Sequence, residues 1–324
     1  MAKINNWPIL VIDTVHPMLL QLLVDNGFEL TEAYQWNKEK ILEEIPNYKG
    51  LVIRSRVTID KAIIDKAVQL KFIARYGAGM ENIDVAYAES KNIKCLHAAA
   101  GNKDAVAEHA LGMLLNLFNN ISKADAEVRQ YQWLREENRG EELAGKTVGV
   151  IGYGNMGSAF AKRLQGFDVK VLVHDKYKKD FIEPATWIEE CSLEKIQAEA
   201  TVVSLHVPLT IETNGMANYK WLNAFKNSFY LINTARGKIL NTADALSLMN
   251  ENKIKGMCLD VLEYEDTSFE HLNASHQNET ITALFNSQKV ILTPHIAGWS
   301  QQSNIKLAHV LYNAIEECCN KQLR

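Results

Sequence analysis

Glycines at positions 152, 154 and 157 directly follow a hydrophobic run and open a segment with helical spacing. This arrangement is typical of a turn that binds a dinucleotide pyrophosphate. Gly152 would make the tight turn, Gly154 would let the backbone approach the phosphates, and Gly157 would allow close helix–strand packing. The unpaired N–H groups at the helix N-terminus would bind the anion. A purely structural βαβ turn without a ligand is the alternative.

Asp175 stands 18 residues after Gly157, at the end of the next predicted strand, residues 169–173. A carboxylate at this place accepts hydrogen bonds from the adenosine ribose hydroxyls and repels a 2′-phosphate. The sequence therefore predicts NAD as the cofactor, in preference to NADP.

Two arginines end predicted strands in the first hundred residues. Arg54 follows residues 50–53, Arg75 follows residues 71–74, and a Gly77-Ala78-Gly79 turn comes after Arg75. Ligands of parallel sheets bind beyond the carboxyl ends of the strands. Either arginine alone could be a solvated surface charge. Together with the N–H donors of the glycine-rich turn they favour binding of an anionic small molecule.

The elements that must position these groups alternate between strand and helix. Strands are predicted at 9–12, near 28, and at 50–53, 71–74, 93–96, 147–151, 169–173, 201–206, 228–233, 257–261 and 290–292. Helices are predicted at 17–26, 38–45, 59–67, 85–90, 103–130, 158–164, 219–225, 243–250 and 303–318, and a flexible surface loop at 263–279. The alternation predicts an α/β fold with parallel sheets covered on both faces. His109 is expected to be a packed, hydrogen-bonded histidine and not a catalyst.

The composition excludes several classes of protein. A net charge of −4 over 324 residues offers no basic face for nucleic acid or an anionic membrane. The five cysteines are odd in number and lack CxxC spacing, which predicts reduced thiols and no metal site. No apolar run approaches the ~18 residues of a membrane span, and no signal peptide is apparent, so a cytoplasmic protein is expected.

Four motifs occur in a fixed order: GYGNMG at 152–157 with HD at 174–175, NTARG at 233–237, LDVLEYE at 259–265 and ILTPHIAGWS at 291–300. In this combination the chain resembles the D-isomer-specific 2-hydroxyacid dehydrogenase family. ARYGAGMENIDV at 74–85 and GNKDAVAEHALGMLL at 101–115 extend the resemblance over nearly the whole chain.

The resemblance implies two doubly wound parallel-sheet domains with a cleft between them. A flavodoxin-like substrate domain would comprise residues 1–101 and 296–324, and a Rossmann NAD domain residues 102–295. It also implies a homodimer or homotetramer.

The same resemblance gives catalytic roles to Arg236, Glu265 and His295. His295 would exchange a proton with the substrate oxygen while a hydride moves between nicotinamide and carbon, and an imidazole, which titrates near ~6.5 in peptides, suits that task. Glu265 would orient the ring and favour its protonated form, and Arg236 would bind the substrate carboxylate and polarise the carbonyl. Asp266 stands where the family usually has proline, and Glu263 is a second candidate for the carboxylate role.

Further site residues are implied by the resemblance alone. The cofactor contacts are Gly152, Gly154, Asn155, Met156, Gly157, Asp175, His206, Val207, Thr234, Ala235, Asp260 (on the nicotinamide carboxamide) and Gly298. The substrate contacts are Arg54, Ser55, Arg75, Ala78, Gly79, Arg236 and His295. Trp299 would narrow the pocket or stack on the substrate.

Several guanidinium groups suit a phosphorylated acid, because a dianion needs several donors to replace its water. The predicted reaction is NAD-dependent oxidation of 3-phospho-D-glycerate to 3-phosphohydroxypyruvate, a step of serine biosynthesis. Arg135 could reach the site of a neighbouring subunit. The chain ends at Arg324, so no C-terminal regulatory domain is expected. A hydroxypyruvate or glyoxylate reductase is the alternative within the family, and a non-enzymatic, NAD-sensing corepressor-like protein is the alternative outside enzymes.

Overall fold

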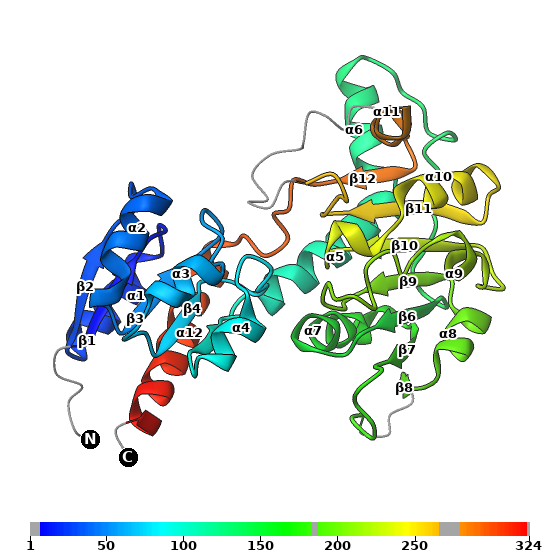
Figure 1. Cartoon of the computed structure of the whole chain (residues 1–324). Coiled ribbons are helices and arrows are strands. Elements are labelled where there is room, and N and C mark those ends of the chain that lie inside the picture. The colour runs from blue at the N-terminus through cyan, green and yellow to red at the C-terminus, as the bar shows by residue number, and fades with distance from the viewer. Residues whose placement is uncertain (1–6, 183–186, 266–278, 323–324) are drawn as a thin grey trace. The chain divides into compact units, whose positions relative to one another are not determined.

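The computed structural model describes residues 7–182, 187–265 and 279–322. Contacts divide these residues into two compact units, residues 7–103 with 299–322 and residues 104–265 with 279–298. Each unit is built on one parallel β-sheet (Figure 1). The two-sheet α/β fold is thus as predicted, while the proposed domain limits after residues 101 and 295 stay a prediction.

The first unit holds five parallel strands in the order β2-β1-β3-β4-β5, the flavodoxin-like arrangement. The strands are β1 (Trp7–Val11), β2 (Phe28–Glu32), β3 (Gly50–Ile53), β4 (Phe72–Arg75) and β5 (Lys94–His97). The helices are α1 (Pro17–Asp25), α2 (Lys38–Glu44), α3 (Lys61–Lys66), α4 (Val85–Ser90) and α12 (Gln301–Gln322), with a 3₁₀ turn η1 at Ile45–Asn47.

Alternate residues of β1 face opposite sides of this sheet, as the pleat requires. Ile9 and Val11 join a buried cluster with residues of α1 and α12, whereas Leu10 joins a second cluster with residues of α2 and α3. The C-terminal helix α12 therefore packs against the N-terminal sheet, and both faces of the sheet are covered.

The second unit holds seven parallel strands in the order β12-β11-β10-β9-β6-β7-β8, a Rossmann order extended by one strand. The strands are β6 (Thr147–Ile151), β7 (Lys170–His174), β8 (Ile188–Glu190), β9 (Val202–Leu205), β10 (Phe229–Asn233), β11 (Ile254–Leu259) and β12 (Val290–Leu292). The helices are α5 (Lys103–Phe118), α6 (Ile121–Arg129), α7 (Asn155–Leu164), α8 (Leu193–Glu199), α9 (Tyr219–Asn223), α10 (Thr242–Asn250) and α11 (Glu279–Asn286), with 3₁₀ turns η2 at Gln165–Phe167 and η3 at Gly237–Ile239.

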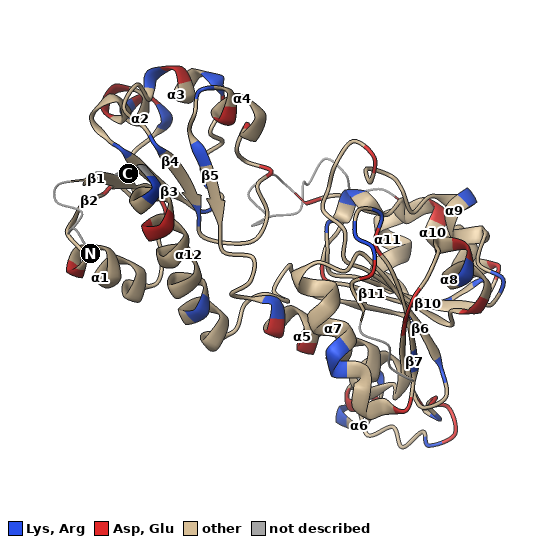
Figure 2. Cartoon of the chain, turned by 90° about the horizontal axis from the view of Figure 1, so that it is seen from below, with Lys and Arg blue, Asp and Glu red and all other residues tan. Residues whose placement is uncertain are grey.

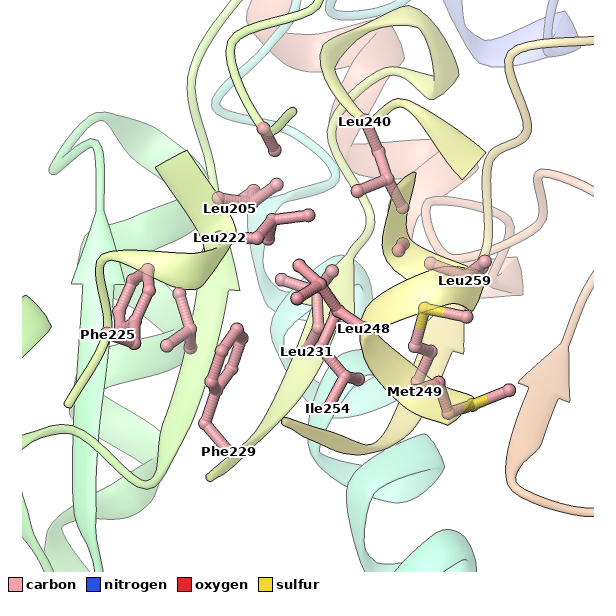
Figure 3. Packing of buried hydrophobic residues seen from close by; sticks show 14 of the residues in the cluster. Leu205, Leu222, Phe225, Phe229, Leu231, Leu240, Leu248, Met249, Ile254 and Leu259 are labelled. Carbon is pink, nitrogen blue, oxygen red and sulfur yellow. The ribbon is translucent and has the colours of Figure 1, made fainter. Parts of the chain in front are cut away.

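A dense hydrophobic cluster joins β9, β10 and β11 to α9 and α10 (Figure 3). Phe225 and Phe229 pack with ring centroids 4.5 Å apart, and both rings are almost wholly buried. Burying a side chain of this size stabilises the folded state by about 1.5–3 kcal/mol. The cluster packs the three strands against α9 and α10, and a predicted site residue follows each strand.

Residues 103–130 form two helices, so the prediction of one long helix is wrong. The chain breaks at Asn120, whose backbone is left-handed with φ of 53°. Asn116 caps the second helix by accepting the Ser122 N–H at 2.8 Å, and Asn119 binds the Leu115 carbonyl at 3.0 Å. Asparagine adopts the left-handed conformation and bonds its own backbone more readily than most residues, which ends α5 here.

The sequence did not predict β8, α8 or α11. Strand β8 is a three-residue edge strand with two glutamates, which gives little hydrophobic pattern. Helix α11 begins where the predicted loop 263–279 ends, and residues 266–278 of that loop lie outside the described residues.

Acidic and basic residues are interspersed on outer helices such as α2 and α8 (Figure 2). No helix in the described ranges is both long and apolar enough to cross a membrane.

Candidate active site

The glycine turn after β6 has the backbone geometry that its sequence predicts. Gly152 has φ of 92°, and a Cβ there would lie 2.7 Å from the His206 carbonyl oxygen. A Cβ at Gly157 would lie 2.0 Å from the Gly152 carbonyl oxygen, whereas nothing lies within 4 Å of a Cβ at Gly154. Helix α7 starts at Asn155 without a side-chain cap. The turn therefore packs closely at Gly152 and Gly157 and leaves room for an anion at Gly154.

The Asp175 carboxylate closes this turn from the end of β7. It accepts the N–H groups of Tyr153 at 2.8 Å, Tyr177 at 3.0 Å and Lys178 at 3.1 Å. Burial opposes ionisation of the carboxyl group, but these N–H groups and the Lys178 ammonium outweigh it and lower the pKa of Asp175. Asp175 is therefore a fixed negative charge beside the glycine turn.

Two buried polar atoms near the ends of β9 and β10 have no partner among the described residues: His206 Nδ1 and Thr234 Oγ1. His206 Nε2 lies 2.8 Å from Ser204 Oγ, and burial lowers the pKa of His206 to about 3, so the ring is neutral. Unpartnered buried polar atoms are rare in native proteins, and a bound ligand is one explanation. With the glycine turn and Asp175, these atoms fit a dinucleotide.

His295 and Glu265 lie together in the second unit. His295 Nδ1 is 2.8 Å from Glu265 Oε2, and the two side chains are 24% and 12% exposed. Glu265 Oε1 accepts the Leu262 N–H at 2.5 Å, which fixes the carboxylate. Glu263 instead accepts the N–H and hydroxyl of Thr242 at 2.7 and 2.8 Å, at the start of α10. Of the two candidate carboxylates, only Glu265 lies beside His295.

Asp260, directly after β11, anchors the loop that carries His295. Its carboxylate is 1% exposed and accepts the Thr293 hydroxyl at 2.6 Å and the N–H groups of Ile296 and Ala297 at 2.8 and 2.9 Å. The Asp260 carbonyl accepts the His295 N–H at 2.8 Å, and His295 has a left-handed backbone with φ of 54°. The loop conformation is thus set by Asp260, whose contact with a nicotinamide carboxamide stays a prediction.

His109 on α5 completes this network. Its Nε2 lies 3.0 Å from Thr293 Oγ1 and 3.6 Å from Asp260 Oδ1. Because the Thr293 hydroxyl donates its hydrogen to Asp260, His109 Nε2 must be the donor to Thr293. His109 is therefore the packed, hydrogen-bonded histidine that the sequence predicts.

Arg236 follows β10 in a turn that Asn233 organises. The fully buried Asn233 side chain donates to the Arg236 carbonyl at 3.0 Å and accepts the Ala235 N–H at 3.1 Å. The half-buried Arg236 side chain donates from Nη1 to the Ala235 carbonyl at 2.6 Å.

The remaining cofactor candidates lie where their motifs put them. Asn155 and Met156 begin α7, and Gly298 is the last residue of the second unit. Val207 packs against the glycine turn, since a Cβ at Gly152 would lie 3.0 Å from Val207 Cγ1. The predicted substrate residues divide between the units, since only Arg236 and His295 belong to the second.

Five predicted substrate residues lie at the carboxyl ends of β3 and β4 in the first unit. Arg75 Nε donates to the Arg54 carbonyl at 3.1 Å, and Arg75 is 9% exposed. Ser55, Ala78 and Gly79 make no hydrogen bond within the described part of the chain. Their N–H groups are therefore available to a ligand.

Sequence reasoning missed Asp13, which organises this edge of the first sheet. Its carboxylate is 5% exposed, accepts the Arg54 N–H, and lies 3.1 Å from Arg56 Nε. Arg56 also donates to the carbonyls of Trp36 and Ile12 at 2.9 and 2.6 Å, so its guanidinium is structural. The only sequence signal for Asp13 is its place just after the first hydrophobic run.

Comparison with known proteins agrees with this architecture. The model of the NAD binding domain of D-isomer specific 2-hydroxyacid dehydrogenases matches residues 111–297. The D-3-phosphoglycerate dehydrogenase of Archaeoglobus fulgidus is 29% identical over 303 residues, which are 94% of this chain and 55% of that protein. The glyoxylate reductase of Thermofilum pendens is 34% identical over 286 residues, which are 86% of this chain and 81% of that protein. The chain thus spans about half the length of the first relative and most of the second.

A solved structure has the same fold. The D-lactate dehydrogenase of Aquifex aeolicus, solved with NAD and lactic acid, is 27% identical with a TM-score of 0.82 over 98% of this chain and 96% of that one. The matched family region covers more than half of the 324 residues and contains the glycine turn, Asp175 and His295. This chain therefore belongs to the D-isomer specific 2-hydroxyacid dehydrogenase family and carries the NAD-binding domain of that family.

Proposed function

We propose that this protein is an NAD-dependent dehydrogenase that interconverts a D-2-hydroxy acid and its 2-oxo acid. The observation that carries this proposal is the 2.8 Å contact between His295 Nδ1 and Glu265 Oε2, in the same unit as the glycine turn. A histidine held by a carboxylate is suited to proton exchange with a substrate oxygen.

Each of the three residues has a separate task in this reaction. NAD, when bound, supplies or accepts the hydride at the substrate C2 carbon. With Nδ1 turned to Glu265, His295 gives a proton from Nε2 to the carbonyl oxygen as the 2-oxo acid is reduced, and takes it back in oxidation. Glu265 stabilises the imidazolium, and Arg236 binds the substrate carboxylate through paired N–H donors.

We further propose 3-phospho-D-glycerate and 3-phosphohydroxypyruvate as the substrate pair. Support comes from the first unit, where Arg54 follows β3, Arg75 ends the neighbouring strand β4, and Ala78 and Gly79 come shortly after it. Several donors at one place suit a dianion, whose hydration must be replaced on binding.

A second candidate substrate is an unphosphorylated acid, glyoxylate or hydroxypyruvate. The observation that favours it is the glyoxylate reductase of Thermofilum pendens, which is 34% identical and is covered over 81% of its length. The catalytic proposal for Arg236, Glu265 and His295 is the same for both substrates.

The deciding experiment compares initial rates of NADH oxidation with 3-phosphohydroxypyruvate, hydroxypyruvate, glyoxylate and pyruvate. We expect kcat/KM to be at least about tenfold higher for the phosphorylated acid, a preference of ~1.4 kcal/mol in the transition state. A higher value for an unphosphorylated acid would assign the second candidate. If the protein binds NADH, turns over none of these acids and captures a partner protein, the corepressor-like alternative replaces both.

Replacing Asp175 with serine should shift the coenzyme preference toward NADPH. Removing the carboxylate removes its repulsion of a 2′-phosphate, and the ammonium groups of Lys176 and Lys178 lie next to it in sequence. We expect the NADPH-to-NADH ratio of kcat/KM to rise about tenfold or more. Asp180→Ser, on the same segment, is the control. An unchanged NADPH-to-NADH ratio of kcat/KM in Asp175→Ser would show that Asp175 does not determine the coenzyme preference.

We also propose that the protein is a homodimer through the second unit. Exposed apolar side chains gather on α6 and the segment after it: Ile121, Val128, Tyr131, Trp133 and Leu134, with Tyr131 99% exposed. Large exposed apolar surfaces are typical of protein interfaces, which supports a subunit contact at this segment. Trp133→Glu should convert the dimer to a monomer in sedimentation velocity, whereas Tyr177→Glu, another exposed aromatic, should not.

A further inference from the structure

Trp299 is held against Arg54 in the first unit. The Arg54 Cζ atom lies 4.5 Å from the centroid of the Trp299 ring, the geometry of a cation–π contact. The Trp299 side chain is 69% exposed overall, so this contact covers one face of an otherwise open ring. The ring face that Arg54 covers is not available to stack on a substrate.

The backbone of Arg54 is fixed while its guanidinium is uncommitted. Its N–H donates to Asp13, and its carbonyl accepts Arg75 Nε and Asn82 Nδ2, each at 3.1 Å. In the described ranges no carboxylate or carbonyl accepts a hydrogen bond from the Arg54 guanidinium. The Trp299 ring therefore holds the Arg54 guanidinium without accepting a hydrogen bond from any of its five N–H donors.

Arg56, two residues later, shows the contrast. Its guanidinium donates to Asp13 and to the carbonyls of Trp36 and Ile12, which uses the donors for structure. A long arginine side chain without such partners samples many rotamers in water, and ordering it on binding weakens the complex. An arginine already stacked on a ring avoids part of that loss.

We propose that Trp299 is a positioning residue that presents the Arg54 guanidinium to the second anionic group of the substrate, and so sets the preference for a doubly anionic acid over an unphosphorylated one. This inference rests on the proposed dehydrogenase function and extends it to a residue that does not itself bind the anion. It replaces both roles that the sequence suggests for Trp299, narrowing of the pocket and stacking on the substrate.

The test is a double-mutant cycle with Trp299→Leu, Arg54→Met and the double variant, with kcat/KM measured for 3-phosphohydroxypyruvate and glyoxylate. Trp299→Leu should lower kcat/KM for the phosphorylated acid about fivefold, mainly through KM, and change the value for glyoxylate by less than about twofold. In the Arg54→Met background the same substitution should have no further effect on the ratio. Trp299→Phe, which keeps a ring, should restore most of the loss.

Additive effects of the two substitutions, or equal losses for both acids, would overturn the proposal in favour of direct stacking of Trp299 on the substrate. Melting temperature and NADH affinity serve as folding controls, because Trp299 and Arg54 both lie outside the NAD-binding unit.

A second readout does not depend on turnover. Binding of inorganic phosphate to the full chain, followed by line broadening in ³¹P NMR, should weaken in both Trp299→Leu and Arg54→Met. If the wild-type protein reduces no 2-oxo acid but phosphate binding still depends on both residues, the proposed function fails, while the positioning of the Arg54 guanidinium by Trp299 stands. If Trp299→Leu binds phosphate as tightly as the wild type, the inference is overturned whatever the enzyme activity.

Discussion

Replacing His295 with alanine is expected to lower kcat by about 10²-fold or more while NADH affinity stays nearly unchanged. The imidazole is the group held by Glu265 at 2.8 Å, and its loss leaves the substrate oxygen without a proton donor. The glycine turn and Asp175 lie on other elements, so the nucleotide should still bind. Stopped-flow turnover and fluorescence titration with NADH measure the two quantities separately.

His309→Ala is the matched control, since His309 is exposed on α12 and should be silent in both assays. Glu265→Gln should give an intermediate loss of kcat, because the ring keeps a hydrogen-bond partner but loses its counter-charge. Near-normal turnover of His295→Ala would show that a group other than His295 transfers the proton.

Gly157→Ala is expected to destabilise the second unit and to abolish high-affinity NADH binding. The new Cβ would lie 2.0 Å from the Gly152 carbonyl oxygen, so the α7 N-terminus must move away from the turn. Overpacking of this kind costs about 1–3 kcal/mol, which lowers the melting temperature of a domain this size by several degrees. Thermal unfolding and NADH titration of the same samples give both effects.

Substitutions at two other glycines distinguish a loss of packing from a loss of ligand contact. Nothing lies within 4 Å of a Cβ at Gly154 or Gly166. Gly154→Ala should fold normally and bind NADH about tenfold more weakly, because in the proposed function its methyl group would occupy space needed by the pyrophosphate. Gly166→Ala should change neither stability nor NADH binding. A stable Gly157→Ala that binds NADH like the wild type would contradict the close packing described for the turn.

The sequence predicted the strands of both sheets well, because buried parallel strands are short uninterrupted runs of β-branched residues bounded by turn residues. The helix boundary at Asn120 was missed for a physical reason. The apolar stripe continues across the break, and only the backbone preference of Asn119 and Asn120 stops the helix. Strand β8 was missed because its two glutamates hide the pattern.

The local geometry at Gly152 and Asp175 was predictable because a backbone motif fixes it, while their roles in cofactor binding stay a prediction. The contact between the Asp175 carboxylate and the Tyr153 N–H was not predictable, because it joins residues far apart in the chain. The resemblance favours Glu265 and leaves Glu263 as a second candidate, because the choice depends on which carboxylate the turn after β11 directs at His295. The stacking of Arg54 on Trp299 likewise depends on the return of α12 to the first sheet.

The bonds of Asp175 have a consequence for the evolution of this protein. The Asp175 carboxylate accepts one N–H group of the glycine turn and two of the segment that follows Asp175, and in the proposed function it also selects the coenzyme. A substitution of Asp175 that admits NADPH therefore also removes these hydrogen bonds, so a change of coenzyme is expected to lower the stability of the turn. In the described part of the chain the Arg54 guanidinium stacks on Trp299 and donates no hydrogen bond, so single substitutions there can change substrate preference without breaking a hydrogen-bond network. Lineages that descend from this protein should exchange substrates more often than coenzymes.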